Sequence, residues 1–456
     1  TGNMIQNNQI KDLPNAGSRG VGLLQNGYAS VLNNCFENVD YGVQTNNMYL
    51  AGNPEEISGN TFQTLNLAVY INLHYQNAPR FDVKNNVASG GDLGYIAYSM
   101  GDAVELAFEN NDVTGTGEGY RLWNIPTSNP VTITGGTLTG NDVGVRFYNQ
   151  HPSFGDGGSS EAILDGVTIM GSTNEGVKVE DLIGGGTNTL DLTILNSEIT
   201  ENSTGVLATG EDAAVDLNTS TVSDNTNFGV RVLGGSANIQ NNFIDGNNIG
   251  ISVENDGTTD GTAMVNNNDL EANATFGIQN LTANAVDATC NWWGTTTLAT
   301  IETLINESPG SIDVSLLLNN GADDNVATPG FQPVPGSCIT TCPDVPTLLT
   351  LEMSSTADND GTVCNGQDIT CSAVVGNAGD IDDEYLFFLD ANNSGEYESP
   401  GDVLLQAQST ASTFTGSTAD GATNELMDVD VVGVTVVNTA SGCSETTTET
   451  IGVEAV

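Results

Sequence analysis

The stretches "TSTVSDNTNFGVRV" (219–232) and "NNFIDGNNIGISV" (241–253) repeat one short pattern. In each, apolar residues alternate with polar ones, Asn residues interrupt the alternation, and a Gly-apolar-x-apolar segment closes the unit. Alternation of this kind predicts a strand with one buried face, and Asn and Gly predict tight turns. The pair therefore predicts two successive units built from short strands.

The Gly of this unit, once replaced by Ala, marks the repeat along the chain. Successive marks are between 21 residues (Gly229 to Gly250) and 32 residues (Gly144 to Gly176) apart. This period is typical of one coil of a parallel β-helix, whereas leucine-rich repeats need a fixed leucine frame that is missing here. The marks are Gly20, Gly42, Ala68, Gly94, Gly119, Gly144, Gly176, Gly205, Gly229, Gly250 and Gly277.

Asn residues recur at matching positions of the repeat, as at Asn34, Asn60 and Asn268. Asn favours tight turns, and its amide can bond to an equivalent amide or to backbone in the next coil. We therefore interpret these residues as structural and not as catalytic.

The charge of the chain limits its partners. Its 456 residues include 58 Asp and Glu but only eight Lys and Arg, for a formal net charge of −50. Nucleic acid is excluded because phosphate binding needs clustered cations. The sequence contains no run of about 20 apolar residues, so it predicts no segment that inserts into a membrane. The first residues lack the basic and apolar regions of a signal peptide and begin within repeat-like sequence, so we expect further coils or another domain before Thr1.

Seven cysteines are scattered along the chain without the spacing of a metal site. With low basicity and much Asn, Thr and Gly, they indicate a secreted, extracellular protein with a few disulfides. Cys290 and Cys338 are candidates to pair, although Cys342 competes for either partner.

The repeat units resemble right-handed parallel β-helix repeats of secreted surface proteins and polysaccharide-active enzymes. In many of these proteins the last coil ends in a motif similar to "ATCNWWG" (288–294). The resemblance covers about residues 1–300 and implies a right-handed parallel β-helix, which we assign to 1–294. It does not imply one function, because adhesins, lyases and hydrolases share the coil.

An open end of a coil exposes unpaired backbone and an apolar core. We expect Trp292 and Trp293 to cover that end and Gly294 to let the chain turn away, within a capping segment and linker at 295–343. The apolar spacing in 298–305 predicts a short amphipathic helix over the same end. Stacking of the tryptophans on a sugar is the alternative.

Short alternating strands over 344–456 predict a β-sandwich of the immunoglobulin type. The stretch from "GTVCNGQDITCSAV" (361–374) to the "SGCS" turn (441–444) resembles Ig-like or PKD-like modules of large surface proteins of Bacteroidetes. The resemblance implies a disulfide between Cys364 and Cys443. It leaves Cys371 as a buried thiol.

The segment "DANNSGEYESPGD" (390–402) carries oxygen ligands at alternating positions around a Gly at position six, as calcium loops do. Its closing carboxylate falls at position 13 instead of 12, so a plain acidic hairpin turn is the alternative to a Ca²⁺ site. The candidate ligands are Asp390, Asn392, Ser394, Glu396 (through its carbonyl), Glu398 and Asp402.

Half of the basic residues occupy one position of the repeat, two residues after its Gly: Arg121, Arg146, Lys178 and Arg231. In register, the first three stack on one outward face. They predict either a strip that binds an anionic ligand such as an acidic polysaccharide, or salt bridges with carboxylates such as Glu118 and Glu180.

No motif fixes a reaction: both histidines lie in irregular segments, and nucleophile-elbow and phosphate-loop motifs are missing. We therefore expect a non-enzymatic structural or adhesive protein, part of a larger surface fibre or adhesin that self-associates or joins neighbouring modules. A polysaccharide lyase or hydrolase and a sugar-binding module are the alternatives. A groove lined by aromatic residues and paired acids on consecutive coils would favour the enzyme, whereas a smooth surface of Thr, Asn and Asp would favour the structural role.

Overall fold

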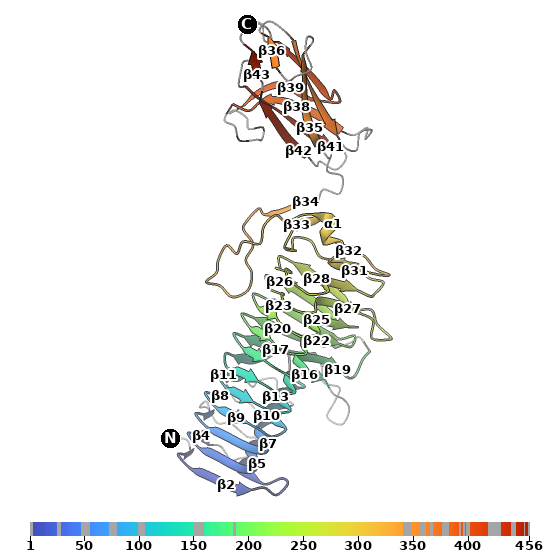
Figure 1. Ribbon diagram of the computed structural model, residues 1–456. Coiled ribbons are helices and arrows are strands. Elements are labelled where there is room, and N and C mark those ends of the chain that lie inside the picture. Colours follow the sequence, from blue (N-terminus) through green and yellow to red (C-terminus); the bar gives the residue numbers. More distant parts are fainter. Residues whose placement is uncertain are drawn as a thin grey trace. The chain divides into compact units, whose positions relative to one another are not determined.

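The fold class predicted from the sequence is confirmed by the computed structural model: a parallel β-helix is followed by antiparallel β-sheets (Figure 1). Two compact units divide the chain, Thr1–Thr341 and Cys342–Val456. Among the described residues, no helix is long and apolar enough to cross a membrane. The described residues are 3–24, 29–46, 55–72, 80–98, 105–149, 159–185, 188–340, 348–355, 362–364, 368–375, 383–391, 394, 397, 402–417, 430–438, 444–450 and 452–454.

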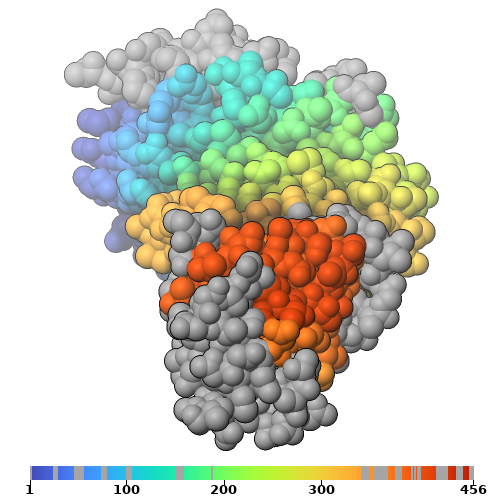
Figure 2. All heavy atoms as spheres, turned by 90° about the horizontal axis from the view of Figure 1, so that it is seen from above, coloured from blue at the N-terminus to red at the C-terminus, as the bar shows by residue number. Residues whose placement is uncertain are grey.

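The first face of the β-helix is a sheet of 13 parallel strands, each paired with its equivalent in the neighbouring turns. Successive turns follow one another in sequence order, from blue to yellow in Figure 2. The strands are β1 (Met4–Gln6), β4 (Ser30–Leu32), β6 (Glu55–Ser58), β8 (Phe81–Lys84), β11 (Leu106–Glu109), β14 (Val131–Thr134), β17 (Ser160–Asp165), β20 (Leu190–Leu195), β23 (Ala213–Asn218), β26 (Ser236–Gln240), β28 (Thr262–Asn266), β30 (Val286–Asp287) and β32 (Ile312–Asp313).

A sheet of 19 strands forms two further faces, which β5 (Cys35–Asn46) and β7 (Thr61–Asn72) join by pairing along both. The second face has β2 (Gln9–Leu13), β9 (Val87–Ser89), β12 (Asp112–Thr114), β15 (Thr137–Thr139), β18 (Thr168–Met170), β21 (Glu198–Thr200) and β24 (Thr221–Ser223). The third face has β3 (Arg19–Leu24), β10 (Leu93–Tyr98), β13 (Glu118–Trp123), β16 (Val143–Asn149), β19 (Glu175–Asp181), β22 (Thr204–Thr209), β25 (Phe228–Leu233), β27 (Ile249–Glu254), β29 (Phe276–Asn280) and β31 (Ile305–Glu307).

The core is a set of columns, in which the same inward position of each turn stacks on the next. One column of the first face is Val31, Ile57, Val83, Phe108, Ile133, Leu164, Ile194, Leu217, Ile239 and Val265, all buried. The repeat Gly is required by the stacking of the turns. A Cβ on Gly119 would lie 2.5 Å from the carbonyl oxygen of Gly144 in the next turn.

Buried Asn side chains form the ladders that the repeat predicts. In the corner before the second face, Asn34 Nδ2 donates to Asn60 Oδ1 at 3.1 Å, and Asn60 Nδ2 donates to Asn86 Oδ1 at 2.9 Å. Asn268 continues the same corner in later turns, where it accepts from Asn242 and donates to Asn291. A second ladder between the second and third faces runs through Asn202, Asn225, Asn247 and Asn273. Each amide thus satisfies its neighbour inside the core.

The β-helix extends beyond residue 294, where the sequence predicted its end. Short strands β31 and β32 pair with β29 and β30 and add another turn. The predicted amphipathic helix is a single turn, α1 (Leu298–Ile301), which buries Ile301.

The two tryptophans of the predicted cap differ, since successive residues of extended backbone face opposite ways. Trp293 is 2% exposed and packs in the core, with its ring against Gly277. Trp292 instead lies on the outer surface and donates Nε1–H to Glu271 at 2.9 Å. Trp293 therefore lies in the core of the last turns, with β31 and β32 after it, and its role as a cap stays a prediction. Gly294 has a positive φ of +77°.

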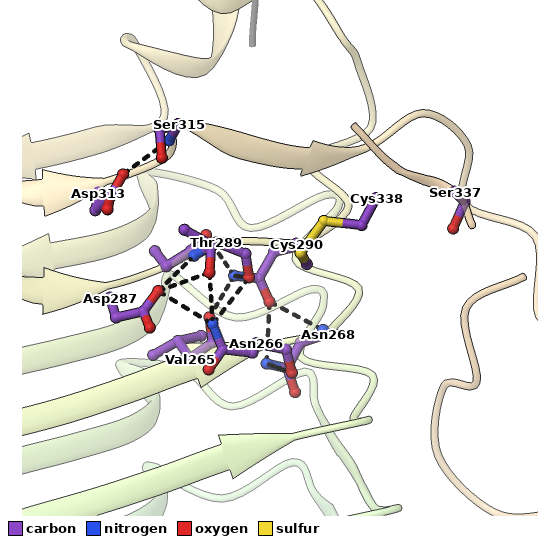
Figure 3. The surroundings of a disulfide bond; sticks show 12 residues. Val265, Asn266, Asn268, Asp287, Thr289, Cys290, Asp313, Ser315, Ser337 and Cys338 are labelled. Atoms are coloured by element: carbon purple, nitrogen blue, oxygen red, sulfur yellow. Dashed lines mark hydrogen bonds between the residues drawn. A yellow bond between two sulfur atoms is a disulfide. The ribbon is translucent and has the colours of Figure 1, made fainter. Parts of the chain in front are cut away.

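After the last turn, residues 319–337 form a strap that follows β33 (Leu316–Leu318) and precedes its antiparallel partner β34 (Cys338–Thr340). The predicted disulfide Cys290–Cys338 ties the end of the strap to the β-helix (Figure 3). Along the strap, the buried ring of Phe331 contacts Phe243 at 5.4 Å between centroids. The strap is thus held against the outer corner of several turns.

The second unit contains antiparallel sheets around a core that includes Ile369, Phe387, Phe414 and Val434. One sheet has β35 (Leu348–Ser355), β37 (Asp368–Val375) and β40 (Thr413–Ser417). Another has β38 (Asp383–Leu389), β39 (Val403–Ser409), β41 (Val431–Asn438) and β42 (Ser444–Thr450), and β36 (Thr362–Cys364) pairs with β43 (Gly452–Glu454). This arrangement is that of the predicted β-sandwich.

Candidate functional site

The basic ladder lies on the outer side of the third face. Arg121, Arg146 and Lys178 occupy one register position of β13, β16 and β19, so they stack on consecutive turns as the repeat predicts. Arg231 is at the same position of β25 but is separated from Lys178 by Leu207. The ladder is therefore three adjacent cations and one separate cation.

Carboxylates alternate with these cations in a network of ion pairs. Glu118 accepts from Arg121 at 2.8 Å and from Arg146 at 3.2 Å. Glu180 accepts from Arg146 at 2.5 Å and from Lys178 at 2.9 Å. These contacts are the salt bridges that the sequence allowed as the alternative to an anion-binding strip. Arg231 forms a separate pair with Glu254 at 2.7 Å.

An aromatic ladder runs beside the basic one. Tyr98, Trp123 and Tyr148 share the register position two residues further along β10, β13 and β16. Ring centroids are 4.2 Å apart between Tyr98 and Trp123 and 5.5 Å apart between Trp123 and Tyr148. At one end Tyr70 stacks on Tyr98 at 6.2 Å, and at the other the Arg146 guanidinium lies over the Tyr148 ring at 4.6 Å.

The sequence analysis missed this ladder, although a signal was present. Each of the three aromatic residues stands four residues after the repeat Gly of its coil, just as each base stands two residues after it. Inspection of the repeat for constant offsets of aromatic residues would have found it. We name the eight residues of the two ladders and their carboxylates the outer strip: Tyr98, Glu118, Arg121, Trp123, Arg146, Tyr148, Lys178 and Glu180.

The outer strip is only partly accessible to solvent. The side chains of Glu118 and Glu180 are 13% and 16% exposed, and that of Arg146 is 25% exposed. Burial alone would raise the pKa of Glu180, but hydrogen bonds from Lys178 and Arg146 outweigh it and lower the pKa. The ion pairs therefore keep Glu180 charged, and a carboxylate held in this way is a poor proton donor.

A second cluster of acids lies where the strap meets the β-helix. The backbone of Asp269 pairs with that of Phe243 on one side and with that of Trp292 on the other, and Asp269 is 9% exposed. Burial, together with the nearby charges of Glu271 and Asp245, raises the pKa of Asp269 to about 6. The backbone N–H of Glu271 donates a hydrogen bond to the carboxylate of Asp269 at 2.9 Å.

Two neighbouring groups complete this acid corner, which we define as Asp224, Asp245, Asp269 and Glu271. Burial, and then the charge of Asp224, raises the pKa of Asp245 as well. The strap covers both aromatic neighbours of Asp269: Phe331 packs on Phe243, and a side chain at Gly321 would collide with the Trp292 indole. The predicted alternative, a sugar stacked on the tryptophans, is opposed by the burial of Trp293 and by this contact to Trp292.

A shallow groove crosses the outer side of the first face between β20 and β30. Its polar lining includes Asp191, Asp216, Asn238 and Asp287, and Met264 is half exposed beside them. Asp216 accepts from Asn238 at 3.1 Å, and Asp287 accepts from the Thr289 hydroxyl at 2.7 Å. The groove thus offers acceptors and no cation.

The predicted calcium loop is described only in part. Asp390 and Asp402 are buried, and each accepts a backbone N–H of the loop, from Ser394 at 2.9 Å and from Ala391 at 3.0 Å. Asn392, Glu396 and Glu398 lie outside the described residues. Within the described residues, no group of three or more His, Cys, Asp or Glu could hold a metal ion. The Ca²⁺ site stays a prediction.

The other cysteine predictions stand as follows. Cys371 is buried in the second unit, and burial raises the pKa of its thiol to about 12, so it is an inert thiol as expected. Cys443, Cys342 and the side chain of Cys364 lie outside the described residues. The pair Cys364–Cys443 stays a prediction.

Comparison of the chain with family models, with curated proteins and with solved structures finds no significant match.

Proposed function

We propose that this chain is a non-enzymatic extracellular protein with a structural or adhesive role, part of a larger surface fibre or adhesin. One observation carries the proposal: the turns pair in register from β1 to β32, and buried Asn ladders join many of them, as Asn60 joins Asn86 and Asn242 joins Asn268. Such a coil is a rod in which each turn contacts only its neighbours. It suits a spacer or a scaffold that presents other surfaces.

Two features support an extracellular location and assembly with other modules. The disulfide Cys290–Cys338 fixes the strap, and disulfides persist in oxidising compartments. The net charge of −50 keeps the chain soluble and attracts divalent cations such as Ca²⁺. We propose that the chain associates with itself or with neighbouring modules of the same polypeptide.

Electron microscopy of the native secreted material, before proteolysis or tagging, tests this proposal. Antibody against the β-helix should label fibres or filaments attached to cells. Discrete monomers in the culture medium would contradict the structural role.

A polysaccharide-active enzyme is the second candidate, and the acid corner is the observation that favours it. Asp269 has a raised pKa, Asp245 lies on the adjacent turn, and glycoside hydrolysis uses a pair of carboxyl groups of which one is a proton donor. The strap over Phe243 and Trp292 opposes access of a substrate. Release of reducing sugar from a polysaccharide panel, abolished in Asp269→Asn, would establish this function in place of the first.

A further inference from the structure

We propose that the outer strip is a binding site for an extended polysaccharide, which lies along the axis of the β-helix and contacts one turn after another. The inference rests on the proposed adhesive function, because it names the ligand that the rod would hold. It uses the basic ladder that the sequence singled out and the aromatic ladder that the structure adds to it.

The spacing of the outer strip fits a polymer of sugars. Equivalent residues of adjacent turns are about 4.8 Å apart, the separation of neighbouring strands. This distance is close to the length of one sugar residue in an extended chain. Arg121, Arg146 and Lys178 therefore repeat with the period of such a ligand, and so do Tyr98, Trp123 and Tyr148. A ligand that repeats along its length can meet the same chemistry at each turn.

The chemistry of the outer strip fits hydroxyl groups. The guanidinium of Arg146 is fixed between Glu118 and Glu180, so donors and acceptors alternate at set positions. Charged hydrogen-bonding groups held rigid in this way bind neutral hydroxyls without further loss of side-chain entropy. The Nε1–H of Trp123 is buried, so the indole contributes its partly exposed ring and not a donor.

The aromatic ladder contributes apolar surface beside these polar groups at Trp123, which is partly exposed. Tyr98 and Tyr148 are buried and pack on either side of the Trp123 ring, so they fix its position. A sugar has both apolar C–H surface and hydroxyls, and a site that combines aromatic groups with a few oriented polar groups matches both.

Two other polymers fit the outer strip less well. An extended peptide that adds a strand needs a free backbone edge, but β13, β16 and β19 are each paired on both sides. A nucleic acid needs unpaired cations, whereas all three bases of the outer strip are in ion pairs on a chain of net charge −50.

Affinity gel electrophoresis of the full chain tests the inference, with gels that contain polygalacturonate, alginate, xylan or glucomannan. Retarded migration in at least one gel is expected. The two acidic polymers and the two less charged ones distinguish a carboxylate-bearing ligand from a hydroxyl-only ligand, and either result supports the site. Normal migration in all four gels would overturn it.

Three variants locate the binding. Arg146→Gln removes the central donor and should weaken retardation about tenfold, because a hydrogen bond to a charged group contributes that much. Trp123→Phe keeps an aromatic ring but reduces the partly exposed aromatic surface, and should weaken retardation about threefold. Arg231→Gln is the matched control, since Arg231 has the same register position and one ion pair but lies outside the outer strip. Equal loss in the control would also overturn the site.

Circular dichroism of the variants establishes that they are folded, and Trp123→Phe tests the site even if Arg146→Gln unfolds. The inference and the proposed function fail in different ways. If the chain forms fibres but does not bind polysaccharide, the binding site is contradicted and the structural role is supported. If the chain binds polysaccharide but is secreted as discrete monomers, the binding site is supported and the structural role is contradicted.

Discussion

The turns up to Arg231 and the turns after it share one coil but neutralise their acids differently. All eight Lys and Arg precede residue 232. In that part carboxylates pair with bases across turns, as Lys84 does with Glu56 at 2.7 Å. Beyond it Glu254 still pairs with Arg231, but other acids rely on hydroxyl, amide and backbone donors, as Asp256 does with the Thr258 hydroxyl at 2.7 Å, or they are buried, as Asp269 is. We refer to the two parts as the paired turns and the base-free turns.

The difference shows that the coil itself does not require ion pairs. Its stability comes from columns and ladders that are the same in both parts, such as Asn60 in one and Asn268 in the other. Surface charge is then free to vary with function. The paired turns suit a fixed hydrogen-bonding surface, whereas the base-free turns suit cations, protons or neighbouring modules.

The largest expected effect comes from the end of the base-free turns. Trp293→Ala leaves a cavity at the last turns and should lower the free energy of unfolding there by about 3–5 kcal/mol. Hydrogen exchange should accelerate in β27, β29 and β31 but not in β10 to β16, since each turn contacts only its neighbours. Trp292→Ala is the control and should cost about 1 kcal/mol, because Trp292 forms a surface hydrogen bond. Equal acceleration along the whole coil would show that the two parts unfold together.

The next effect tests whether buried acids make the base-free turns sensitive to pH. The pKa of Asp269 is raised to about 6, so its contribution to stability is complete below the unfolded pKa and is lost as pH rises through 6. At pH 7.5 the charged form should destabilise the corner by up to about 3 kcal/mol. Asp269→Asn should therefore raise the urea midpoint at pH 7.5 and leave it nearly unchanged at pH 4.

Asp313→Asn serves as the control for Asp269→Asn, because Asp313 is an exposed acid of the base-free turns. It should change neither midpoint. If Asp269→Asn also failed to raise the midpoint at pH 7.5, burial under the strap would not govern the stability of this corner.

The repeat made the coil predictable because its marks have a strict physical cause. Gly119 and its equivalents are required by the approach of the next turn, and Asn60 by the ladder, so both recur visibly in the sequence. The last turn was missed because β31 and β32 are too short to show alternation. The opposite directions of Trp292 and Trp293 follow from strand geometry and were overlooked.

The candidate sites were less predictable than the fold, for a reason that the outer strip illustrates. Arg146 and Lys178 could be placed from the repeat alone. Their pairing with Glu118 and Glu180 depends on side-chain conformations that register does not determine. The acid corner depends on the strap, whose path across Phe243 no repeat encodes.

A smaller effect concerns cations in the second unit, which also lacks Lys and Arg. If the predicted loop at 390–402 binds Ca²⁺, a Ca²⁺ concentration ten times the dissociation constant should stabilise that unit by about 1.4 kcal/mol. Thermal unfolding with Ca²⁺ and with EGTA measures this, and Asp402→Asn should abolish the difference. A shift of equal size in Asp402→Asn would place the cation elsewhere among the acids.

The smallest effect separates the two parts by the direction of their pH response. The pKa of Glu180 is lowered although burial opposes this, because Lys178 and Arg146 donate to its carboxylate. Its contribution is therefore present above the unfolded pKa and is lost as pH falls through the folded value, the reverse of Asp269. When the pH is lowered from 7 to 4, the protection of backbone amides from hydrogen exchange should decrease in β16 and β19 and increase at the strap. For a partly exposed pair the change is about 1 kcal/mol or less, and a double-mutant cycle of Glu180→Gln with Arg146→Gln measures it. Protection that changed in the same direction in both parts would mean that ion pairing does not distinguish them.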